Sequence, residues 1–441
     1  MSTISPFSAP TEAAVSERVA AGRRAIGTEA RRRIGLLLTD LNGGGIQKMM
    51  LALAEGLAGR GHEVQLILYE HAGPSGLQIP PGIPVHYLKP IPWLLGRLVP
   101  FRADPAASLR MLLPVLLPWK PLRGLEFLPA LAGHLRHSHL DALISAAPNC
   151  NLEAVWAKRL AGVATRILVS ERSAPSEMLS KSRNWRSRFL PDLMNRTYQQ
   201  ADVIVAVSQG LRDNLAAVAK IPSERIHAIY NPVVGPEVLP AAAAPVTHPW
   251  FAPGQPPVIL AVGRLSAQKD YPSLIRAFAM VRAKRHVRLV ILGAGRHKDK
   301  TEQRQKEIAS LAGELGVGQD VDAAGFSANP YAYMARSAVL ALSSLYEGLP
   351  AVLIQAMACG CPVISTDCPS GPREILEGGR YGPLVPVGDV PALAAAIASV
   401  LNSPPDKDLL RRRAQDFTAE KSVDAYLEAL FPDGEHRGAR S

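Results

Sequence analysis

Short apolar runs alternate with longer amphipathic segments along most of this chain. Each run is a few residues long and is bounded by Gly, Pro or a polar residue, which predicts buried strands at 34–39, 62–68, 141–145, 166–170, 201–208, 226–233, 258–262, 288–292, 321–324, 340–342 and 362–366. Helices are expected between most of them. Strands that alternate with helices form parallel sheets covered by helices, so the expected fold class is α/β.

The stretch 343–376 shows this alternation most clearly. It begins with a loop that contains Gly348 and Pro350, and an apolar helix then runs from Ala351 to Gly360, a residue that suits a helix end. A strand at 362–366 and a loop at 367–372 follow, before a helix opens at 373. Both loops are expected at the carboxyl edge of a sheet, where such folds bind ligands.

The length of 441 residues predicts two domains, because it is too great for one ordinary core. Residues 1–30 contain no apolar segment typical of a secretory signal, and we expect a disordered tail. The first domain is expected at 31–234 and the second at 258–407. Between them, residues 235–257 are rich in Pro and Ala and predict a linker.

Three glycines, Gly43, Gly44 and Gly45, separate the first predicted strand from a helix at 46–60. Backbone N–H groups and the helix dipole favour a phosphate at such a position. A tight turn also requires glycine, and the two interpretations are equally supported. The pattern is not Gly-x-Gly-x-x-Gly, which argues against a nicotinamide cofactor.

The net charge of +11 predicts an anionic partner, such as nucleotide phosphates, membrane lipid or nucleic acid, although it also serves solubility. Nucleic acid is the least favoured of these, because Phe and Tyr are few and do not interleave with basic residues on the predicted strands. The four cysteines lack a metal-binding spacing and are expected to be reduced thiols of a cytosolic protein.

The region 91–138 combines apolar residues with arginines and with Trp93 and Trp119. Charged residues and prolines interrupt it, so it is not expected to span a membrane. One interpretation is a segment that lies in the interface of an anionic membrane, which would imply a lipid-linked acceptor. The other interpretation, ordinary core helices, is at least as well supported.

Two motifs in the second half of the chain carry a resemblance to a known family. Glu347 is followed eight positions later by Gln355 and then by the run AMACGCPVI, which resembles the Glu-x7-Glu signature of retaining glycosyltransferases of family 4 (group 1). The run GRLSAQKDY from Gly263 resembles the Gly-Arg-Leu loop of the same family. These enzymes have the GT-B fold, in which two Rossmann-like domains face each other across a cleft.

The resemblance implies a role for each matching residue. Arg264 and Lys269 would hold the donor diphosphate as it leaves, and Glu347 would align the donor sugar. Gln355 would hold the ribose, although an amide here replaces the usual carboxylate and loses its anionic grip. The other implied donor-binding positions are Gly263, Gly293, Gly325, Phe326, Ser370 and Gly371.

By the same resemblance, the first domain would bind the acceptor. The glycine loop at 43–45 approaches the diphosphate or the acceptor in this family, and many members place a histidine near the end of the strand at 166–170. This chain has Glu171 and Arg172 there, a pair that suits an acceptor hydroxyl or a pyrophosphate, or an internal salt bridge. The helix expected at 408–430 would return to pack against the first domain.

The resemblance implies an enzyme without a metal or another cofactor. The reduced cysteines predict a cytoplasmic protein, and an interfacial region 91–138, together with the net charge of +11, would place it at the inner face of the membrane. Its partners would be a nucleotide-sugar donor, with a UDP-sugar favoured over GDP-mannose, and a glycan or polyprenyl-linked acceptor of cell-surface polysaccharide or glycolipid synthesis. Two alternatives stay open. One is a GT-B epimerase, for which the sequence identifies no acid/base carboxylates, and the other is a nucleotide-sugar-binding protein without turnover, which Gln355 and the missing histidine would explain.

Overall fold

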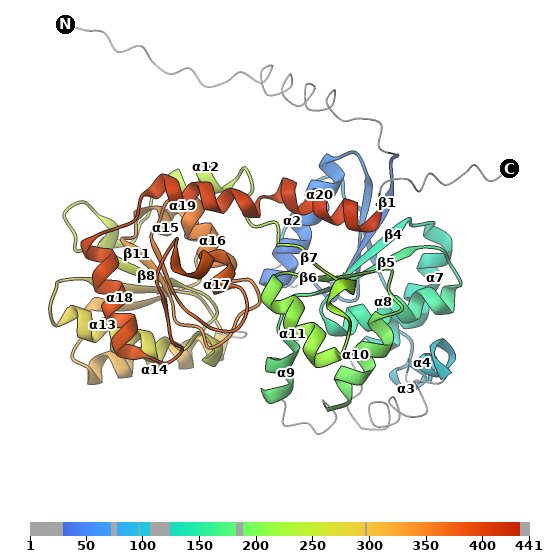
Figure 1. The fold of residues 1–441 in the computed structure, drawn as a ribbon, viewed down its shortest axis with the longest axis horizontal. Coiled ribbons are helices and arrows are strands. Elements are labelled where there is room, and N and C mark those ends of the chain that lie inside the picture. Colours follow the sequence, from blue (N-terminus) through green and yellow to red (C-terminus); the bar gives the residue numbers. More distant parts are fainter. Residues whose placement is uncertain are drawn as a thin grey trace, which may run out of the picture.

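The computed structural model describes residues 30–71, 77–96, 98–105, 124–181, 188–295 and 298–432 of the chain. These residues form two bodies, each a parallel sheet covered by helices, which lie side by side (Figure 1). The α/β class and the two-sheet organisation predicted from the sequence are confirmed. Residues 1–29 of the expected tail and residues 106–123 of the apolar region lie outside the described residues.

The first body contains a seven-stranded sheet with the order β3-β2-β1-β4-β5-β6-β7, in which all neighbours are parallel. Most of its strands are almost entirely apolar, as expected where helices cover both faces of a sheet. In chain order they are β1 (Arg33–Leu38), β2 (Glu63–Leu68), β3 (Val85–Tyr87), β4 (Ala142–Ala146), β5 (Arg166–Glu171), β6 (Val203–Ala206) and β7 (Ile226–Ala228).

Two groups of helices cover the two faces of this sheet. On one face α2 (Gly45–Gly59) and α20 (Ala419–Leu430) pack against the side chains of Leu36, Ile144 and Leu168. The other face, with Leu37 and Val169, is covered by α7 (Leu128–Ser138), α8 (Pro148–Ala161), α10 (Leu190–Tyr198) and α11 (Gln209–Ala219). The shorter helices of this body are α3 (Trp93–Gly96), α4 (Val99–Ala103), η2 (Leu125–Phe127), α9 (Pro175–Lys181) and η4 (Ser223–Arg225).

The second body contains a six-stranded parallel sheet with the order β10-β9-β8-β11-β12-β13. Its strands are β8 (Val258–Val262), β9 (Arg288–Leu292), β10 (Val321–Gly325), β11 (Val339–Leu342), β12 (Val363–Thr366) and β13 (Leu384–Val385). One face packs against α13 (Tyr271–Arg282), α14 (Lys298–Glu314) and α18 (Val390–Asn402). The other packs against α15 (Pro330–Arg336), α16 (Ala351–Ala358), α17 (Pro372–Ile375) and α19 (Lys407–Ala414).

The chain crosses between the two bodies twice, and the two crossing segments pair with each other. The N–H groups of Val233 and Val234 both donate to the Phe417 carbonyl, at 3.1 and 3.0 Å. Ala419 N–H in turn donates to the Val234 carbonyl at 3.0 Å. Beyond this point α20 runs beside α2 on the first body (Figure 1). The last helix of the chain thus completes the core of the domain that was made first.

Two expectations about the connecting segments need correction. The helix expected at 408–430 is two helices, of which α19 stays against α16 of the second body and only α20 reaches the first. The chain breaks between them because Thr418 is extended, with φ of −74° and ψ of 158°, and caps α20 through its side chain. The segment 235–257 includes α12 (Val238–Ala243), which packs on α15, and η5 (Pro249–Phe251). These helices are too short to show a periodic pattern.

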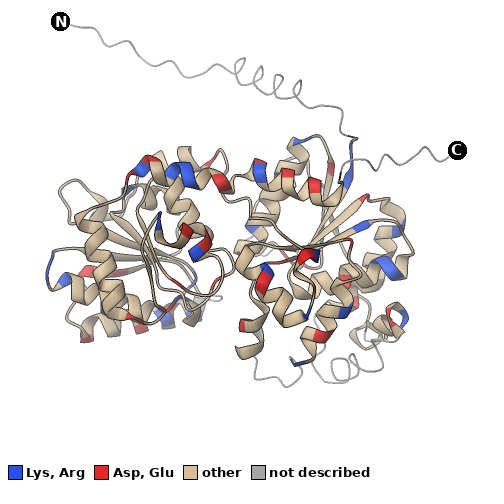
Figure 2. Cartoon of the chain, viewed as in Figure 1, with Lys and Arg blue, Asp and Glu red and all other residues tan. Residues whose placement is uncertain are grey.

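Within the described ranges, no helix combines the length and the apolar character needed to cross a bilayer. Lys and Arg are interspersed with Asp and Glu over both bodies (Figure 2). In this part of the chain, the positive charge is therefore not gathered into a single stripe of the kind that tracks a nucleic acid backbone.

Substitutions in α2 at its contact with α20 can test how α20 is held on the first body. A Cβ atom added at Gly56 would lie 2.5 Å from Val423 Cγ2, whereas one added at Gly59 would meet no atom within 4 Å. Alanine is favoured over glycine in a helix by up to about 1 kcal/mol. We therefore expect Gly59→Ala to raise the melting temperature slightly and Gly56→Ala to lower it, as measured by calorimetry. In a Val423→Ala background the penalty of Gly56→Ala should disappear. Equal effects of the two alanines would contradict this docking.

Candidate active site

The loops that follow the carboxyl ends of the strands meet where the two bodies touch. In the second body these loops begin at Gly263 after β8 and at Gly293 after β9, and they include 343–350 after β11 and 367–371 after β12. Ser208, which follows β6 of the first body, donates its hydroxyl hydrogen to the Gly348 carbonyl at 3.1 Å. The predicted catalytic and donor-binding residues of the second body are thus brought to the side that faces the first.

An ion pair between Lys269 and Glu347 lies at the centre of this region. Lys269 Nζ is 2.6 Å from Glu347 Oε1, and the two side chains are only 13% and 10% exposed. Lys269 ends η6 (Ala267–Lys269), after which Asp270 takes a left-handed conformation and caps α13. The sequence predicted both residues for one site although 78 positions separate them, and the structure brings their side chains into contact.

The sequence did not reveal the residues that orient Glu347. Ser344 Oγ donates to Glu347 Oε1 at 2.7 Å, and Gln268 Nε2 lies 3.5 Å from Glu347 Oε2. Gln268 Nε2 also donates to the Tyr346 carbonyl at 2.9 Å, and Thr366 Oγ1 donates to the Ser344 carbonyl at 2.6 Å. Ser and Gln are ordinary loop residues, so only their position next to the motif residues could have indicated this role.

Glu347 also affects the pKa values of two neighbouring side chains, Tyr271 and Cys368. Burial in the first place, and then the charge of Glu347, raise the pKa of Tyr271. The same two causes raise the pKa of the Cys368 thiol to about 12. Both groups therefore stay protonated at neutral pH. The Tyr271 hydroxyl donates to the Gly263 carbonyl at 3.0 Å, which fixes the loop after β8.

The main chain packs too closely at the end of β9 to admit a side chain. A Cβ atom added at Gly293 would lie 1.8 Å from the Gly263 carbonyl oxygen. Gly263 N–H donates to the Leu292 carbonyl at 2.9 Å, and Gly293 N–H donates to the Gly325 carbonyl at 2.7 Å. The structure therefore gives Gly293 a clear steric reason to be glycine.

Arg264, Phe326 and Gln355 offer side-chain groups to a ligand. Arg264 is exposed, and its side chain forms no hydrogen bond or ion pair with the residues that the structure describes. Phe326, directly after β10, is 73% exposed. Gln355 Nε2 donates to the Tyr331 hydroxyl at 3.1 Å, which leaves the amide oxygen of Gln355 as an acceptor.

The loop after β12 has an unusual backbone. Ser370 and Gly371 have φ of 65° and 68°. For Ser370, which has a side chain, this left-handed conformation costs energy and is maintained only by its surroundings. A Cβ atom added at Gly371 would lie 2.6 Å from Pro350 Cδ and 2.7 Å from the Gly348 carbonyl oxygen. The predicted sugar-binding loop is therefore pressed against the loop that carries Glu347.

The predicted glycine loop of the first body opens α2. Gly43 has φ of 91°, so the turn itself needs glycine, and Gly44 is the N-cap of the helix without a side-chain cap. Gly43 and Gly45 are exposed. The first N–H groups of α2 are therefore open to a ligand. The steric and the anion-binding interpretations of these glycines are both compatible with this geometry.

The acceptor-binding role predicted for Glu171 needs correction, because its side chain points into the core. It is 1% exposed, and its Oε1 accepts hydrogen bonds from the Tyr198 hydroxyl and, at 3.1 Å, from Asn151 Nδ2. Burial raises the pKa of Glu171 to about 7, and these two hydrogen bonds partly offset the effect. Glu171 therefore supports the end of β5 from inside the first body.

The prediction for Arg172 needs the same correction. This residue is 7% exposed and donates to Asn231 Oδ1 at 2.5 Å and to the Tyr426 hydroxyl at 3.2 Å. Neighbouring residues of an extended chain point to opposite sides, so Arg172 turns towards α20 while Glu171 turns towards α8. The internal salt bridge between Glu171 and Arg172, which was the other interpretation, is therefore also wrong.

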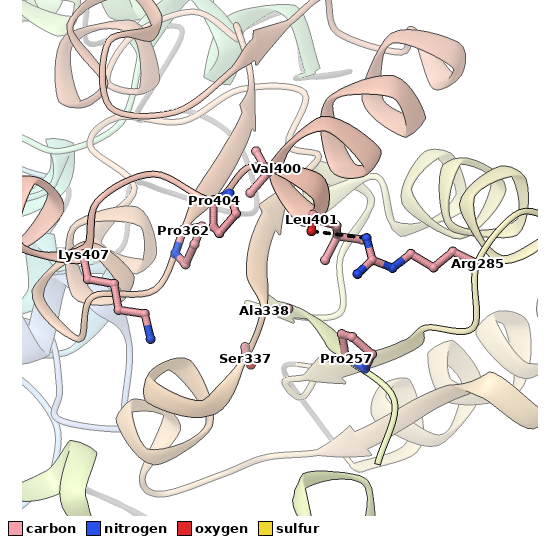
Figure 3. Close-up of a pocket in the computed structure, with 9 residues that line it drawn as sticks. All are labelled: Pro257, Arg285, Ser337, Ala338, Pro362, Val400, Leu401, Pro404 and Lys407. Atoms are coloured by element: carbon pink, nitrogen blue, oxygen red, sulfur yellow. Dashed lines mark hydrogen bonds between the residues drawn. The ribbon is translucent and has the colours of Figure 1, made fainter. Parts of the chain in front are cut away.

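A separate pocket opens at the opposite edge of the second sheet (Figure 3). Pro257, Ala338 and Pro362, which precede β8, β11 and β12, line it. On one side, Arg285 Nη1 donates to the Leu401 carbonyl at 3.2 Å. Ligands of parallel sheets bind at the carboxyl ends of the strands, and this pocket lies at the amino ends. We therefore assign it no part in the site.

Two family models match the chain. The model described as Glycosyltransferase Family 4 matches residues 43–234, and the model described as Glycosyl transferases group 1 matches residues 248–417. The chain belongs to the group 1, family 4 glycosyltransferases. The first match covers the body with the glycine loop, and the second covers the body with Arg264, Lys269 and Glu347.

One relative is the N-acetylgalactosamine-N,N'-diacetylbacillosaminyl-diphospho-undecaprenol 4-alpha-N-acetylgalactosaminyltransferase of Campylobacter jejuni subsp. jejuni serotype O:2. It is 33% identical over 258 residues, which cover 58% of this chain and 64% of the relative. The match therefore spans slightly less than two thirds of that relative's length.

Two solved structures show the same arrangement of two sheets. The apo form of the lipopolysaccharide outer core galactosyltransferase WaaB aligns with 90% of this glycosyltransferase-family chain and 99% of its own, at 19% identity and a TM-score of 0.63. Anabaena HepE in complex with UDP and glucose aligns with 91% of this chain and 100% of its own, at 19% identity and a TM-score of 0.68. The fold is therefore the GT-B fold, as the sequence motifs predicted.

The buried carboxyl group of Glu171 predicts a dependence of stability on pH. Its folded-state pKa of about 7 lies above the ordinary value of 4.5, so between these pH values the folded protein keeps a proton that the unfolded chain has lost. This contribution therefore lowers the free energy of unfolding as the pH rises from 4.5 through 7. Glu171→Gln keeps an acceptor oxygen for Tyr198 and Asn151 and removes the titration. We expect the stability of the variant relative to wild type to rise by roughly 3 kcal/mol across the window.

Urea unfolding at about pH 4.5 and about pH 8 measures this difference. The exposed Glu224 provides the control, since Glu224→Gln makes the same chemical change without burial. A Glu171→Gln difference that is independent of pH would show that Glu171 keeps an ordinary pKa in the folded protein.

Proposed function

We propose that this protein is a retaining glycosyltransferase that moves a hexose or an N-acetylhexosamine from a UDP-sugar to a glycan or polyprenyl-linked acceptor. One observation carries the proposal. The half-buried Lys269–Glu347 pair and the exposed Arg264 lie on the loops after β8 and β11, facing the first body, in a chain of the family 4 glycosyltransferases.

Two cations suit the diphosphate of the donor. Arg264 presents a planar guanidinium that binds phosphate oxygens through paired hydrogen bonds. Lys269 has three N–H donors, of which one is directed at Glu347, so two are open to a phosphate. As the donor bond breaks, negative charge grows on the leaving diphosphate, and both cations stabilise that charge in the transition state.

The hydrogen bonds around Glu347 suit it to align the sugar. Ser344 and Lys269 hold Oε1. Among the described residues, Oε2 has only the 3.5 Å approach of Gln268, so it is available to a sugar hydroxyl. The backbone N–H groups of the loop with Ser370 and Gly371 would bind the same sugar. In the reaction the bond from the anomeric carbon to the diphosphate oxygen breaks, and the acceptor oxygen binds that carbon on the same face. The proton of the acceptor hydroxyl passes to the leaving phosphate oxygen.

The nucleoside half of the donor would lie towards Gln355 and β10. The amide oxygen of Gln355 would accept a hydrogen bond from a ribose hydroxyl, and the exposed ring of Phe326 and the backbone of Gly325 would meet the base. HepE, which shares the fold, was solved in complex with UDP and glucose, and this supports uridine over guanosine in our proposal.

The names of related proteins support an acceptor that a lipid carries. The Campylobacter jejuni relative is named for a substrate built on diphospho-undecaprenol, and WaaB is named for the lipopolysaccharide outer core. In the present chain the open N–H groups at Gly43–Gly45 would bind a diphosphate, either that of the donor or that of a polyprenyl carrier.

An exposed apolar cluster of the first body supports a place at the inner face of the membrane. Trp93, Leu94, Leu95 and Leu98 are 47%, 59%, 55% and 60% exposed, and Arg102 lies in the next helix, α4. Apolar side chains with a basic neighbour suit the interface of an anionic bilayer. The apolar residues 111–120, which the sequence grouped with this cluster, lie outside the described residues.

One feature favours a second candidate function, a nucleotide-sugar-binding protein without turnover. Gln355 stands where the family signature has a carboxylate, and it is partly committed to Tyr331. An amide holds a ribose diol less strongly than a carboxylate does. Donor binding without release of the nucleotide in the presence of any acceptor would favour this candidate.

Binding of nucleotides tests the donor site directly. We expect UDP, and a UDP-sugar more strongly, to raise the melting temperature, since a ligand at 100 times its dissociation constant adds about 2.7 kcal/mol. Arg264→Ala should reduce the shift at least severalfold, and Phe326→Ala should reduce it less. The control is Arg276→Ala, which removes an exposed arginine from α13 of the same body. A shift with GDP instead would correct the base, and no shift with any nucleotide would refute the proposal.

Binding to vesicles tests the membrane surface. We expect the protein to float with vesicles of phosphatidylglycerol and phosphatidylcholine, and the pair Leu94→Asp and Leu98→Asp to lower the bound fraction severalfold. Leu239→Asp is the control, because Leu239 is 65% exposed on α12 and lies outside the cluster. Equal binding of all three proteins would show that the cluster does not face the membrane.

A further inference from the structure

A carboxylate of the second body is bound by the first body. Glu374, in α17, accepts hydrogen bonds from Gln209 N–H at 2.9 Å to each of its oxygens, and its Oε2 lies 3.4 Å from Gly210 N–H. The Tyr230 hydroxyl donates to Glu374 Oε1 at 2.7 Å. Gln209 and Gly210 open α11, where N–H groups and the helix dipole favour a negative charge. The contact is therefore a charge-assisted link between the two bodies.

The loops of the proposed donor-sugar site lie directly beside this link. Glu374 follows Gly371 by three positions, and a Cβ atom added at Gly210 would lie 3.0 Å from Ser370 Cα. One residue before Gln209, Ser208 holds the Gly348 carbonyl. The start of α11 thus contacts both the loop with Ser370 and the loop with Glu347.

The link is also tied to the segment where the chain crosses between the bodies. Arg413 donates to the carbonyl groups of Glu374 and Ile375, at 2.7 and 3.0 Å. Its guanidinium lies 5.0 Å from the centre of the Phe417 ring, and this ring lies 4.9 Å from the ring of Tyr230. Burial, and then Glu374, raise the pKa of Tyr230, so its hydroxyl remains a donor.

We propose that Glu374 is a positioning residue for the transfer reaction: its carboxylate, bound at the start of α11, holds the two bodies at the separation that turnover requires. The role in turnover rests on the proposed function, whereas the link itself does not. Most of the groups that we propose for the donor belong to the second body, so loss of the link leaves donor affinity nearly unchanged. It separates the donor sugar from the acceptor side and lowers the rate of transfer.

The variants change the link in graded steps. Glu374→Gln keeps one acceptor oxygen but presents an N–H group to the amides of Gln209 and Gly210, and Tyr230→Phe removes one donor only. The control, Glu420→Gln, neutralises an exposed carboxylate in the first turn of α20 that forms no hydrogen bond or ion pair with the described residues. Circular dichroism melting curves for all variants establish that they fold.

The first measurement is the distance between the bodies, which needs no substrate. Spin labels at Asp213→Cys in α11 and Met280→Cys in α13 report it by pulsed electron resonance, and both positions are exposed. We expect a narrow distribution for wild type and Glu420→Gln, and a longer, broader one for Glu374→Gln. Tyr230→Phe should fall between them. A distribution for Glu374→Gln that matches wild type would overturn the link.

The second measurement is the steady-state release of UDP from the UDP-sugar that stabilises the wild-type protein. We expect kcat of Glu374→Gln to fall by about tenfold or more, since loss of a hydrogen bond to a charged group changes an equilibrium constant by about tenfold or more. The KM for the donor should stay within about twofold of wild type, and UDP should stabilise the variant as it does wild type.

A wild-type kcat would overturn the positioning role. Loss of UDP stabilisation, as expected for Arg264→Ala, would place Glu374 in the donor site instead. If wild type binds no nucleotide, the proposed function fails, while the distance measurement still decides the link.

Discussion

The pairing of the two crossing segments decides how the rest of this molecule can be arranged. A single connection would leave the two sheets free to rotate. Here the segments at Val234 and Thr418 form a parallel β-bridge, and the Phe417 carbonyl of one segment accepts two hydrogen bonds from the other. Because this pairing limits rotation of the two bodies against each other, the main chain of a loop in one body can lie in contact with the main chain of a loop in the other. A Cβ atom added at Gly348 would lie 2.4 Å from the Arg172 carbonyl oxygen. The close contact of the two bodies at this seam therefore requires glycine at position 348, because the paired crossing segments hold the two loops this near to each other.

The charges near this seam follow one principle. Two half-buried carboxylates are held by donors within reach, Glu347 by Lys269 and Ser344, and Glu374 by the start of α11. Arg264 differs, since its cation is exposed and has no partner among the described residues. Partners at hydrogen-bond distance offset part of the cost of burying a charge, whereas an exposed cation beside them gains from an anionic ligand. This difference separates the charges that shape the site from the charge that is available to bind.

The sequence predicted most of the fold. Strands and helices were visible because burial leaves a pattern of apolar residues, and the motifs around Gly263 and Glu347 named Lys269 and Glu347 separately, without indicating that their side chains pair. Glu171 and Arg172 were misjudged because a charged residue at a strand end can turn to either face, and only the register of the finished sheet decides which. Glu374 looked like an ordinary helix residue, since its partners at Gln209 and Tyr230 come from the other body. Contacts between bodies leave no periodic signal in either segment.

Because α20 packs on the first body, the core of that body is completed late in synthesis. The core of the first body includes Val423, Tyr426 and Leu430, so part of one apolar face of its sheet stays uncovered until residues 419–430 have been translated. Between Val234 and Ala419 the ribosome must add the whole second body, which takes roughly 10–40 s at about 5–20 residues per second. During that time the half-finished first domain exposes the surface that α20 will cover. Residues 419–430 thus complete this core late, and the apolar surface that they cover is open to aggregation until they are made.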